Sequence, residues 1–333
     1  MIIVAPTAFK GTISAAAAAR AMAAGVRAVT AEPILVQPLS DGGPGLIEAL
    51  QPLGGALRLV QVRGPLGELV DARILLRPEG GQAPESSVGR SSYREAVIES
   101  ADACGLHLVP PDRRDPAQLD TFGVGQLIRA AAALSVDRII VGLGGSATVD
   151  GGVGMAAALE GAAVDLPIIA LADVDTLLRD AARVFGPQKG ATPAQVRTLE
   201  AALMALIELT GVPDFPGAGA AGGLAYGLRA FLHAEVVPGS RWVLKQTGLI
   251  DKLPAARAVI TGEGSYDAQS FMGKITGTLV EAARAHGIPV LVVAGSADSS
   301  AGYARVIGNA GARLSEADLE RLVREHLPAL LPS

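Results

Sequence analysis

The sequence predicts an α/β protein in which one open parallel sheet is interrupted by a second, inserted α/β domain. Short apolar runs alternate with helix-like patterns, as where IIVA is followed by SAAAAARAMAAGVRAV and then by ILVQPL. Alternation of this kind is typical of βαβ units and a parallel sheet. Five of the runs fit one sheet, at residues 2–5, 34–39, 138–143, 258–262 and 290–294. Because they are scattered through 333 residues, other material must lie between them.

The expected domain boundaries follow from that scatter. We expect a discontinuous Rossmann-like parallel-sheet domain over residues 1–62, 118–158 and 245–333, and an inserted α/β domain over residues 63–117 and 159–244. Within the insertion, TPAQVRTLEAALMALIELTG predicts an amphipathic helix with Thr192 as its N-cap and Pro193 in the first helical position.

The composition argues against several classes of protein. Lys and Arg number 28 against 33 Asp and Glu, a net charge of -5, and no basic block occurs, so no nucleic-acid partner is expected. The single cysteine, Cys104, lies in an apolar pattern, which favours a buried thiol and a reducing compartment. No run of about 18 apolar residues lacks both charge and dense glycine, so no membrane span is expected. We therefore expect a cytoplasmic protein.

Polar loops rich in glycine follow four of the predicted strands. Their sequences are TAFKGT after the first strand, SDGG after the second, GGSATVDGG after the third, and GEGSYDAQS with a nearby MGK after the fourth. In an open α/β sheet, ligands bind beyond the carboxyl ends of the strands. Any one of these loops could be an ordinary turn, but four at one edge of a sheet favour a binding site.

The residue types in these loops suit phosphoryl transfer. A glycine-rich turn that opens a helix presents backbone N–H groups and the positive end of the helix dipole to phosphate. Phosphoryl transfer also needs cations near the phosphates and carboxylates that hold Mg²⁺ or accept a hydroxyl proton. The candidates are Lys10, Lys189 and Lys274 among the lysines, and Asp41, Asp150, Glu263 and Asp267 among the acids.

Other chemistries find less support in the sequence. Gly273-Lys274-Ile275 has neither the spacing nor the hydroxyl of a P-loop, and no G-x-S-x-G elbow occurs. The four histidines are scattered without the spacing of a metal site. Two stretches that approach a dinucleotide fingerprint lack the acidic residue expected about 20 positions later.

Eight motifs together resemble the glycerate kinase family of the non-P-loop type. In chain order they are FKGTIS, SDGG, ADACGL, TFGVGQLI, GGSATVDGG, VFGPQKGATP, PGAGAAGGL and VITGEGSYDAQSFMGK, and the match runs from about residue 1 to residue 295. The resemblance implies phosphorylation of D-glycerate by ATP with Mg²⁺, usually at the 2-hydroxyl. It also implies two domains, one flavodoxin-like and one a distinct inserted α/β domain.

The resemblance implies roles for particular residues. GGSATVDGG looks like the signature loop of the family, with phosphate contacts from Gly144, Gly145, Ser146 and Thr148. Nucleotide contacts are expected also from Glu263 and Lys274, and Mg²⁺ contacts from Asp41, Asp150 and Asp267. We expect catalytic roles for these three aspartates and for Lys10 and Lys189.

The chain departs from the family pattern at several loop positions. The family usually has Asp at Thr7, Glu at Pro44, Asn at Val149, and Arg followed by Ile or Leu at Ser265 and Tyr266. Each departure removes a charge or an amide from an expected site loop. A kinase for another small hydroxy acid, and a ligand-binding relative with impaired chemistry, are therefore kept as alternatives. The acceptor hydroxyl and a homodimeric state are left open.

Overall fold

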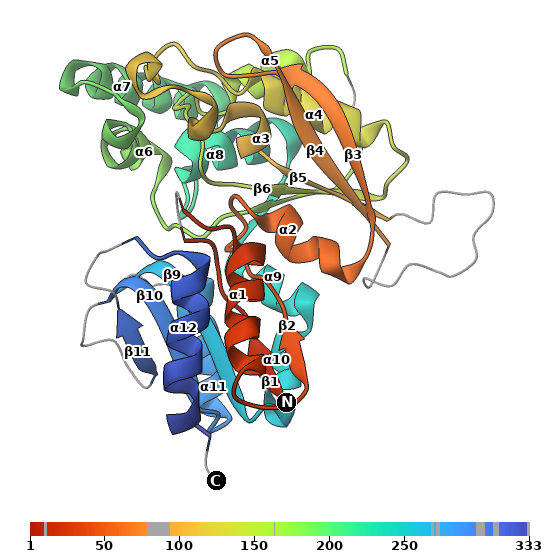
Figure 1. Cartoon of the computed structure of the whole chain (residues 1–333). Coiled ribbons are helices and arrows are strands. Elements are labelled where there is room, and N and C mark those ends of the chain that lie inside the picture. Colours follow the sequence, from red (N-terminus) through yellow and green to blue (C-terminus); the bar gives the residue numbers. More distant parts are fainter. Residues whose placement is uncertain are drawn as a thin grey trace. The chain divides into compact units, whose positions relative to one another are not determined.

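The computed structural model describes residues 1–9, 12–78, 94–162, 164–267, 270, 274–297, 304–308 and 313–331. The protein is an α/β protein with two sheets (Figure 1). The chain forms two compact units. The first unit holds Met1–Asp41, Glu48–Pro52 and Ser240–Ser333, and the second holds Gly42–Ile47 and Leu53–Gly239.

The first unit contains a parallel sheet of five strands in the order β11-β10-β9-β1-β2. The strands are β1 (Ile2–Val4), β2 (Ile34–Val36), β9 (Ala258–Tyr266), β10 (Val290–Ala297) and β11 (Arg305–Gly308). In the register, Ile3 pairs with Leu35 on one side and with Val259 on the other. β1, which lies between β9 and β2, is buried throughout, as expected for a parallel strand covered on both faces.

Helices complete the core of the first unit. They are α1 (Ala15–Arg27), α9 (Gly239–Thr247), α10 (Leu249–Lys252), α11 (Ile275–Ala285) and α12 (Glu316–His326). α1 and α12 lie side by side (Figure 1), and Met22 and Val323 share one hydrophobic cluster with Ile260 of β9. A Cβ atom on Gly25 would lie 2.5 Å from Glu320 O, so glycine is required where α1 approaches α12.

The second unit contains a mixed sheet of six strands in the order β3-β4-β5-β6-β7-β8. Its strands are β3 (Ala56–Arg63), β4 (Leu69–Arg77), β5 (Glu95–Glu99), β6 (Arg138–Gly142), β7 (Ile168–Leu171) and β8 (Glu235–Val237). β3, β4 and β5 pair antiparallel, and the ladder from β5 to β8 is parallel. The carboxyl ends of β5 and β6 therefore meet at one edge.

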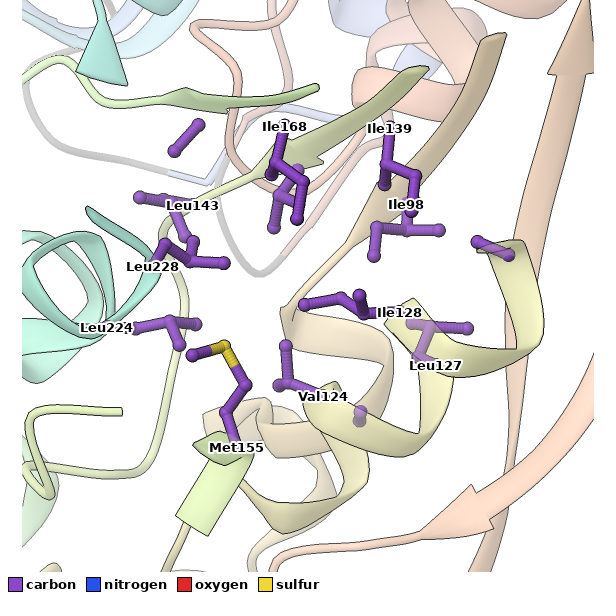
Figure 2. Close-up of a cluster of buried hydrophobic side chains, with 14 of the residues drawn as sticks. Ile98, Val124, Leu127, Ile128, Ile139, Leu143, Met155, Ile168, Leu224 and Leu228 are labelled. Atoms are coloured by element: carbon purple, nitrogen blue, oxygen red, sulfur yellow. The ribbon is translucent and has the colours of Figure 1, made fainter. Parts of the chain in front are cut away.

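The main core of the second unit is aliphatic. Figure 2 shows Ile98 and Ile139 from the strands facing Val124, Leu127 and Ile128. The last three residues belong to α4 (Phe122–Ala132). The other helices of this unit are α3 (Ala101–Cys104), α5 (Val153–Ala158), α6 (Leu178–Phe185), α7 (Pro193–Thr210) and α8 (Ala220–Leu232), and α2 (Leu46–Leu50) lies where the chain passes between units.

The expectation for residues 138–143 is wrong. This run is β6, and it lies in the six-stranded sheet between β5 and β7 instead of in the sheet of β1. Residues 53–62 and 118–158 likewise group with the second unit, and 240–244 with the first. An apolar run bounded by glycine predicts a buried parallel strand but does not specify which of two parallel ladders it joins.

Two local expectations, the start of α7 and the burial of Cys104, are confirmed. Thr192 is the N-cap of α7, where it forms a capping box with Gln195, and Pro193 is the first helical residue. Cys104 is buried and free. Among the described residues, no helix is long and apolar enough to cross a membrane.

Candidate functional site

The signature loop, residues 144–152, follows the carboxyl end of β6. Gly144, Gly145, Gly151 and Gly152 all have positive φ angles, between 66° and 126°, a region that side chains with a Cβ atom rarely adopt. The loop is tied to the ADACGL segment, because Leu106 N donates to Gly145 O at 2.7 Å and Ala147 N donates to Cys104 O at 2.7 Å. The glycines thus create a loop shape that the neighbouring segment holds.

Asp150 braces the end of the signature loop. Its Oδ2 accepts the N–H and the hydroxyl of Thr121, at 2.9 and 2.8 Å, and the N–H of Gly154 at 3.1 Å. Its Oδ1 accepts the N–H of Gly152 at 3.2 Å. Burial raises the pKa of Asp150, and these hydrogen bonds oppose the rise. The carboxylate therefore connects the loop after β6 to the starts of α4 and α5. Oδ1 accepts one of these hydrogen bonds and Oδ2 accepts three, so Oδ1 has more capacity left to accept a hydrogen bond from a ligand or to bind a metal ion.

Lys189 is buried, with 4% of its surface exposed. Its Nζ donates to Ser146 Oγ at 2.8 Å and to Thr148 O at 2.7 Å, so the ammonium group holds the signature loop from within the second unit. Burial lowers the pKa of Lys189 to about 8. The sequence marked this lysine as a ligand contact, but both acceptors found for it belong to the protein.

The expected phosphate contacts of the signature loop divide into two kinds. Ser146 and Thr148 are 3% and 0% exposed, so their hydroxyls face the interior. Gly144 and Gly145 reach the surface, and no hydrogen bond within the described part of the chain uses their N–H groups. The anion donors that this loop offers are therefore backbone amides.

Glu99, at the carboxyl end of β5, was not singled out by the sequence. Its Oε1 accepts the N–H of Ile47 at 2.8 Å, and its Oε2 accepts the N–H of Gly45 at 3.2 Å and lies 3.4 Å from Arg73 Nη2. Burial raises the pKa of Glu99 to about 7. An acid directly after a buried apolar strand is a signal that could have identified it, because desolvation perturbs such a group.

The first unit carries a second polar group of residues at the carboxyl end of β9. Glu263 is 8% exposed, and no hydrogen-bond donor among the described residues reaches its Oε1. Burial raises the pKa of Glu263, whereas Ser270, Lys274 and Thr276 lower it. Lys274 is the N-cap of α11 and makes no side-chain capping bond.

Asp267 lies in the turn that follows β9. Its Oδ2 accepts from Ser265 Oγ at 3.2 Å, and its N–H donates to Ser270 Oγ at 3.2 Å. Ser265 in turn accepts from Ser296 Oγ at 3.1 Å. The position that departs from the family pattern at Ser265 is thus occupied by a short chain of hydroxyls that ends on a carboxylate.

The remaining expected residues are divided between the units. Asp41 is partly buried in the first unit, as is Asp267, whereas Asp150 belongs to the second unit. Within the described residues, no group of three His, Cys, Asp or Glu side chains is placed to hold a metal ion. Lys10 lies outside the residues that the structure describes.

Three departures from the family pattern have structural explanations. Val149 is 1% exposed and belongs to a hydrophobic cluster with Leu178 of α6 and Leu203 of α7, where an amide would be buried. Pro44 packs on the signature loop, since a Cβ atom on Gly145 would lie 2.7 Å from Pro44 Cγ. Thr7 donates from both its N–H and its hydroxyl to Gly262 O, which joins β1 to β9.

Comparisons with known proteins identify the family of the chain. Residues 2–167 and 160–317 match the Glycerate kinase family. A protein of Halalkalibacterium halodurans named glycerate kinase is 38% identical, covering 89% of this chain and 85% of its own length. Glycerate 2-kinase of Escherichia coli K12 is 35% identical, covering 90% and 86%. A crystal structure of a Salmonella typhimurium LT2 protein, provisionally called glycerate kinase 2, superposes with a TM-score of 0.78 at 32% identity over 99% of this chain and 97% of that one.

Proposed function

The chain belongs to the glycerate kinase family, and we propose that it phosphorylates D-glycerate at the 2-hydroxyl to give 2-phosphoglycerate. Membership of this kinase family implies that the phosphoryl donor is ATP. The reaction breaks the bond between the γ-phosphorus and its bridging oxygen, forms a bond from that phosphorus to the glycerate oxygen, and releases the hydroxyl proton. The protein must therefore bind anions, neutralise the transferred phosphoryl group and orient one hydroxyl.

The observation that carries the proposal is the braced signature loop. Gly144 and Gly145 reach the surface, and their N–H groups take part in no hydrogen bond within the described residues. Asp150 and Lys189 fix the loop from beneath. Preorganised backbone amides of this kind stabilise negative charge without rearranging during the reaction. We assign to them a phosphoryl group or the glycerate carboxylate.

A nucleotide with Mg²⁺ fits the polar group at the end of β9. The buried Oε1 of Glu263 has no hydrogen-bond donor among the described residues, and Asp267 supplies a second carboxylate nearby in sequence. Oxygen ligands are those that Mg²⁺ prefers, and the metal would neutralise charge on the phosphates. Lys274 and the N-terminus of α11 would attract the same phosphates.

The acids that we assign to chemistry are Asp41 and Asp267. Asp150 fits a bracing role better than that of a metal ligand, because it already accepts four hydrogen bonds from the protein. Asp41 is our candidate for orienting the glycerate hydroxyl. Replacing Asp41 or Asp267 by Asn should lower kcat by about a hundredfold, the scale of a lost general base.

Release of ADP with three acceptors tests the substrate. We expect turnover with D-glycerate and at least about tenfold lower kcat/KM with L-glycerate and with tartronate, since a misplaced hydroxyl or an added carboxylate costs that much in a preorganised site. Faster turnover of L-glycerate or tartronate would favour a kinase for another hydroxy acid. Binding of ATP without release of ADP for any of the three would favour a ligand-binding relative.

The alternative substrate rests on a specific observation. Ser265 and Thr7 stand where the family usually has charged side chains, and both are engaged in hydrogen bonds within the first unit. A site with less charge would favour a different acid. The acceptor panel separates this alternative from the main proposal.

A further inference from the structure

Glu99 holds a segment of chain that belongs to the second unit although its neighbours in sequence belong to the first. Residues 42–47 group with the second unit, while Asp41 and Glu48 on either side group with the first. Both oxygens of Glu99 bind this segment, at 2.8 Å to Ile47 N and at 3.2 Å to Gly45 N. The segment directly follows Asp41, the residue to which we assign the orientation of the acceptor hydroxyl.

The surroundings of Glu99 are built to keep this carboxylate in place. Arg73 lies in β4 next to Ile74, which pairs with Ile98 of β5. Its guanidinium makes a two-point ion pair with Asp102 of α3, at 2.8 Å through Nε and at 2.8 Å through Nη2. Among the described residues, Arg73 and Asp102 are the charged groups that shift the pKa of Glu99, downward and upward respectively. Asp102 thus fixes the guanidinium group of Arg73, and Nη2 of the same group lies 3.4 Å from Glu99 Oε2.

A direct catalytic role for Glu99 does not fit this geometry. The side chain is 2% exposed, and each oxygen already accepts a backbone N–H. A general base must reach the proton that it removes, either directly or through one water molecule. Because its oxygens accept the N–H groups of Gly45 and Ile47, Glu99 instead holds the loop that contains these two residues.

We propose that Glu99 is a positioning residue, which fixes the segment Gly42–Ile47 through the N–H groups of Gly45 and Ile47 and thereby fixes the SDGG turn that carries Asp41. The effect on catalysis rests on the proposed function. The effect on the loop does not.

The ionisation of Glu99 makes this role dependent on pH. Burial raises the pKa of Glu99 to about 7, and Arg73 and the two amides oppose the rise. An ionised carboxylate can accept both amides, whereas a protonated carboxyl group has one oxygen that carries a hydrogen and accepts more weakly. The two amides lower the pKa of Glu99, so while this side chain stays buried the segment is held more firmly above pH 7, where Glu99 is ionised, than below it.

Hydrogen exchange of residues 42–50 tests the loop without any assay of activity. In the full-length protein, we expect the protection of this peptide, corrected for intrinsic exchange, to fall by about tenfold from pH 8 to pH 6, the scale of one charge-assisted hydrogen bond. Glu99→Gln should remove the pH dependence and leave protection low at both values. Unchanged protection in that variant would overturn the proposal.

The kinetic arm compares three variants with D-glycerate and ATP. Glu99→Gln should lower kcat by about tenfold at pH 8, leave KM for ATP within about twofold, and abolish the decline of kcat below pH 7, because misplacement of a reacting group affects chemistry more than nucleotide binding. Arg73→Met should move that decline to higher pH, because the positive charge that favours ionised Glu99 is lost. If Glu99→Gln fails to fold, the shift of the kcat profile in Arg73→Met tests the proposal alone. A profile in Arg73→Met that matches the wild type would contradict the proposal.

Glu95→Gln is the matched control. Glu95 is equally buried at the other end of β5 and pairs with Arg77 at 2.8 Å and Arg138 at 2.9 Å, away from the SDGG turn. Its loss should leave the pH profile of kcat unchanged, and an effect equal to that of Glu99→Gln would reduce Glu99 to a stabilising residue. If the wild type shows no kinase activity, the proposed function fails, and the exchange experiment still tests the loop.

Discussion

Lys189 is a buried cation, and both of its observed acceptors belong to the signature loop. Ser146 Oγ and Thr148 O receive two of its three donors. A buried ammonium group is costly unless it is hydrogen-bonded, so this lysine and this loop depend on each other. The same arrangement places a positive charge directly beneath a loop that we expect to bind anions.

Replacing Lys189 by Met tests that dependence. Met preserves the length of the side chain but leaves Ser146 Oγ and Thr148 O without a donor. We expect kcat/KM to fall by at least about tenfold and the free energy of unfolding to fall by about 1–3 kcal/mol, the cost of unsatisfied buried polar groups. The exposed Lys245, changed to Met, is the control and should alter neither quantity. A loss of activity without a loss of stability would return Lys189 to direct ligand contact.

Thr121 offers a second test of the brace. Its hydroxyl donates to Asp150 Oδ2 at 2.8 Å and accepts the N–H of Met155 at 2.9 Å. Thr121→Val keeps the shape but removes both bonds, so we expect the free energy of unfolding to fall by about 1–3 kcal/mol in urea denaturation. Thr12→Val, which removes the hydroxyl that the exposed Thr12 donates to Phe9 O, should cost less. Equal costs would mean that Asp150 is not a structural centre of the loop.

Single residues show where prediction from sequence reaches its limit. Glycine content and chain order were enough to identify the signature loop, because glycine is the residue that readily adopts positive φ angles. The sequence could not show that Ser146, Thr148 and Lys189 face the interior, since burial depends on the ADACGL and FGPQKGA segments packing on the loop. Glu99 was missed for the same reason: its partners at Gly45 and Ile47 are more than 50 residues away.

At the scale of elements, the start of α8 packs directly on the signature loop. Gly222 O accepts from Gly151 N at 3.1 Å. A Cβ atom on Gly222, whose φ is +71°, would lie 2.0 Å from Thr148 O. The PGAGAAGG segment therefore needs glycine both for its backbone shape and for close approach.

Two glycines with similar φ angles separate those two requirements. Gly222→Ala introduces strain and a clash, whereas Gly211→Ala, at φ +66° after α7, introduces strain alone, with no atom within 4 Å of its Cβ. We expect losses of free energy of unfolding of about 1 kcal/mol for Gly211→Ala and at least about twice that for Gly222→Ala. Only Gly222→Ala should also lower kcat. Equal losses would mean that the loop can move away from α8.

Elements differ in how far their own sequence determines them. The capping box of α7 lies within four consecutive residues, so Thr192 and Gln195 could be identified locally. The sheet that β6 joins could not be, because the choice depends on its pairing with β5, where Val97 pairs with Ile140. Both units contain parallel strands that alternate with helices, so the apolar runs of these strands look alike. Fold class was accordingly predicted correctly while the membership of one strand was wrong.

At the scale of the whole molecule, buried acids determine how stability depends on pH. Burial raises the pKa of Glu99 to about 7 and also raises the pKa values of Asp150 and Glu263. A pKa raised on folding means that the folded state binds the proton more tightly. The contribution of Glu99 to stability is therefore complete below about pH 4.5 and is lost as pH rises through about 7.

Urea denaturation at pH 5 and pH 7.5 measures this effect. We expect the free energy of unfolding to be lower at pH 7.5, with Glu99 contributing on the order of 2 kcal/mol. Glu99→Gln should reduce the difference between the two pH values, and Glu325→Gln, at an exposed position of α12, should not. Stability that rises between pH 5 and pH 7.5 would contradict the assignment of Glu99 as a buried acid.

The identity of the phosphorylated product tests the central claim most directly. After the protein has consumed D-glycerate and ATP, enolase alone should convert the product to phosphoenolpyruvate, because enolase acts on 2-phosphoglycerate and not on 3-phosphoglycerate. Without phosphoglycerate mutase, we predict the same extent of conversion as with authentic 2-phosphoglycerate. Conversion that appears only after mutase is added would contradict phosphorylation at the 2-hydroxyl, and no phosphoglycerate at all would contradict the assignment of D-glycerate as the substrate.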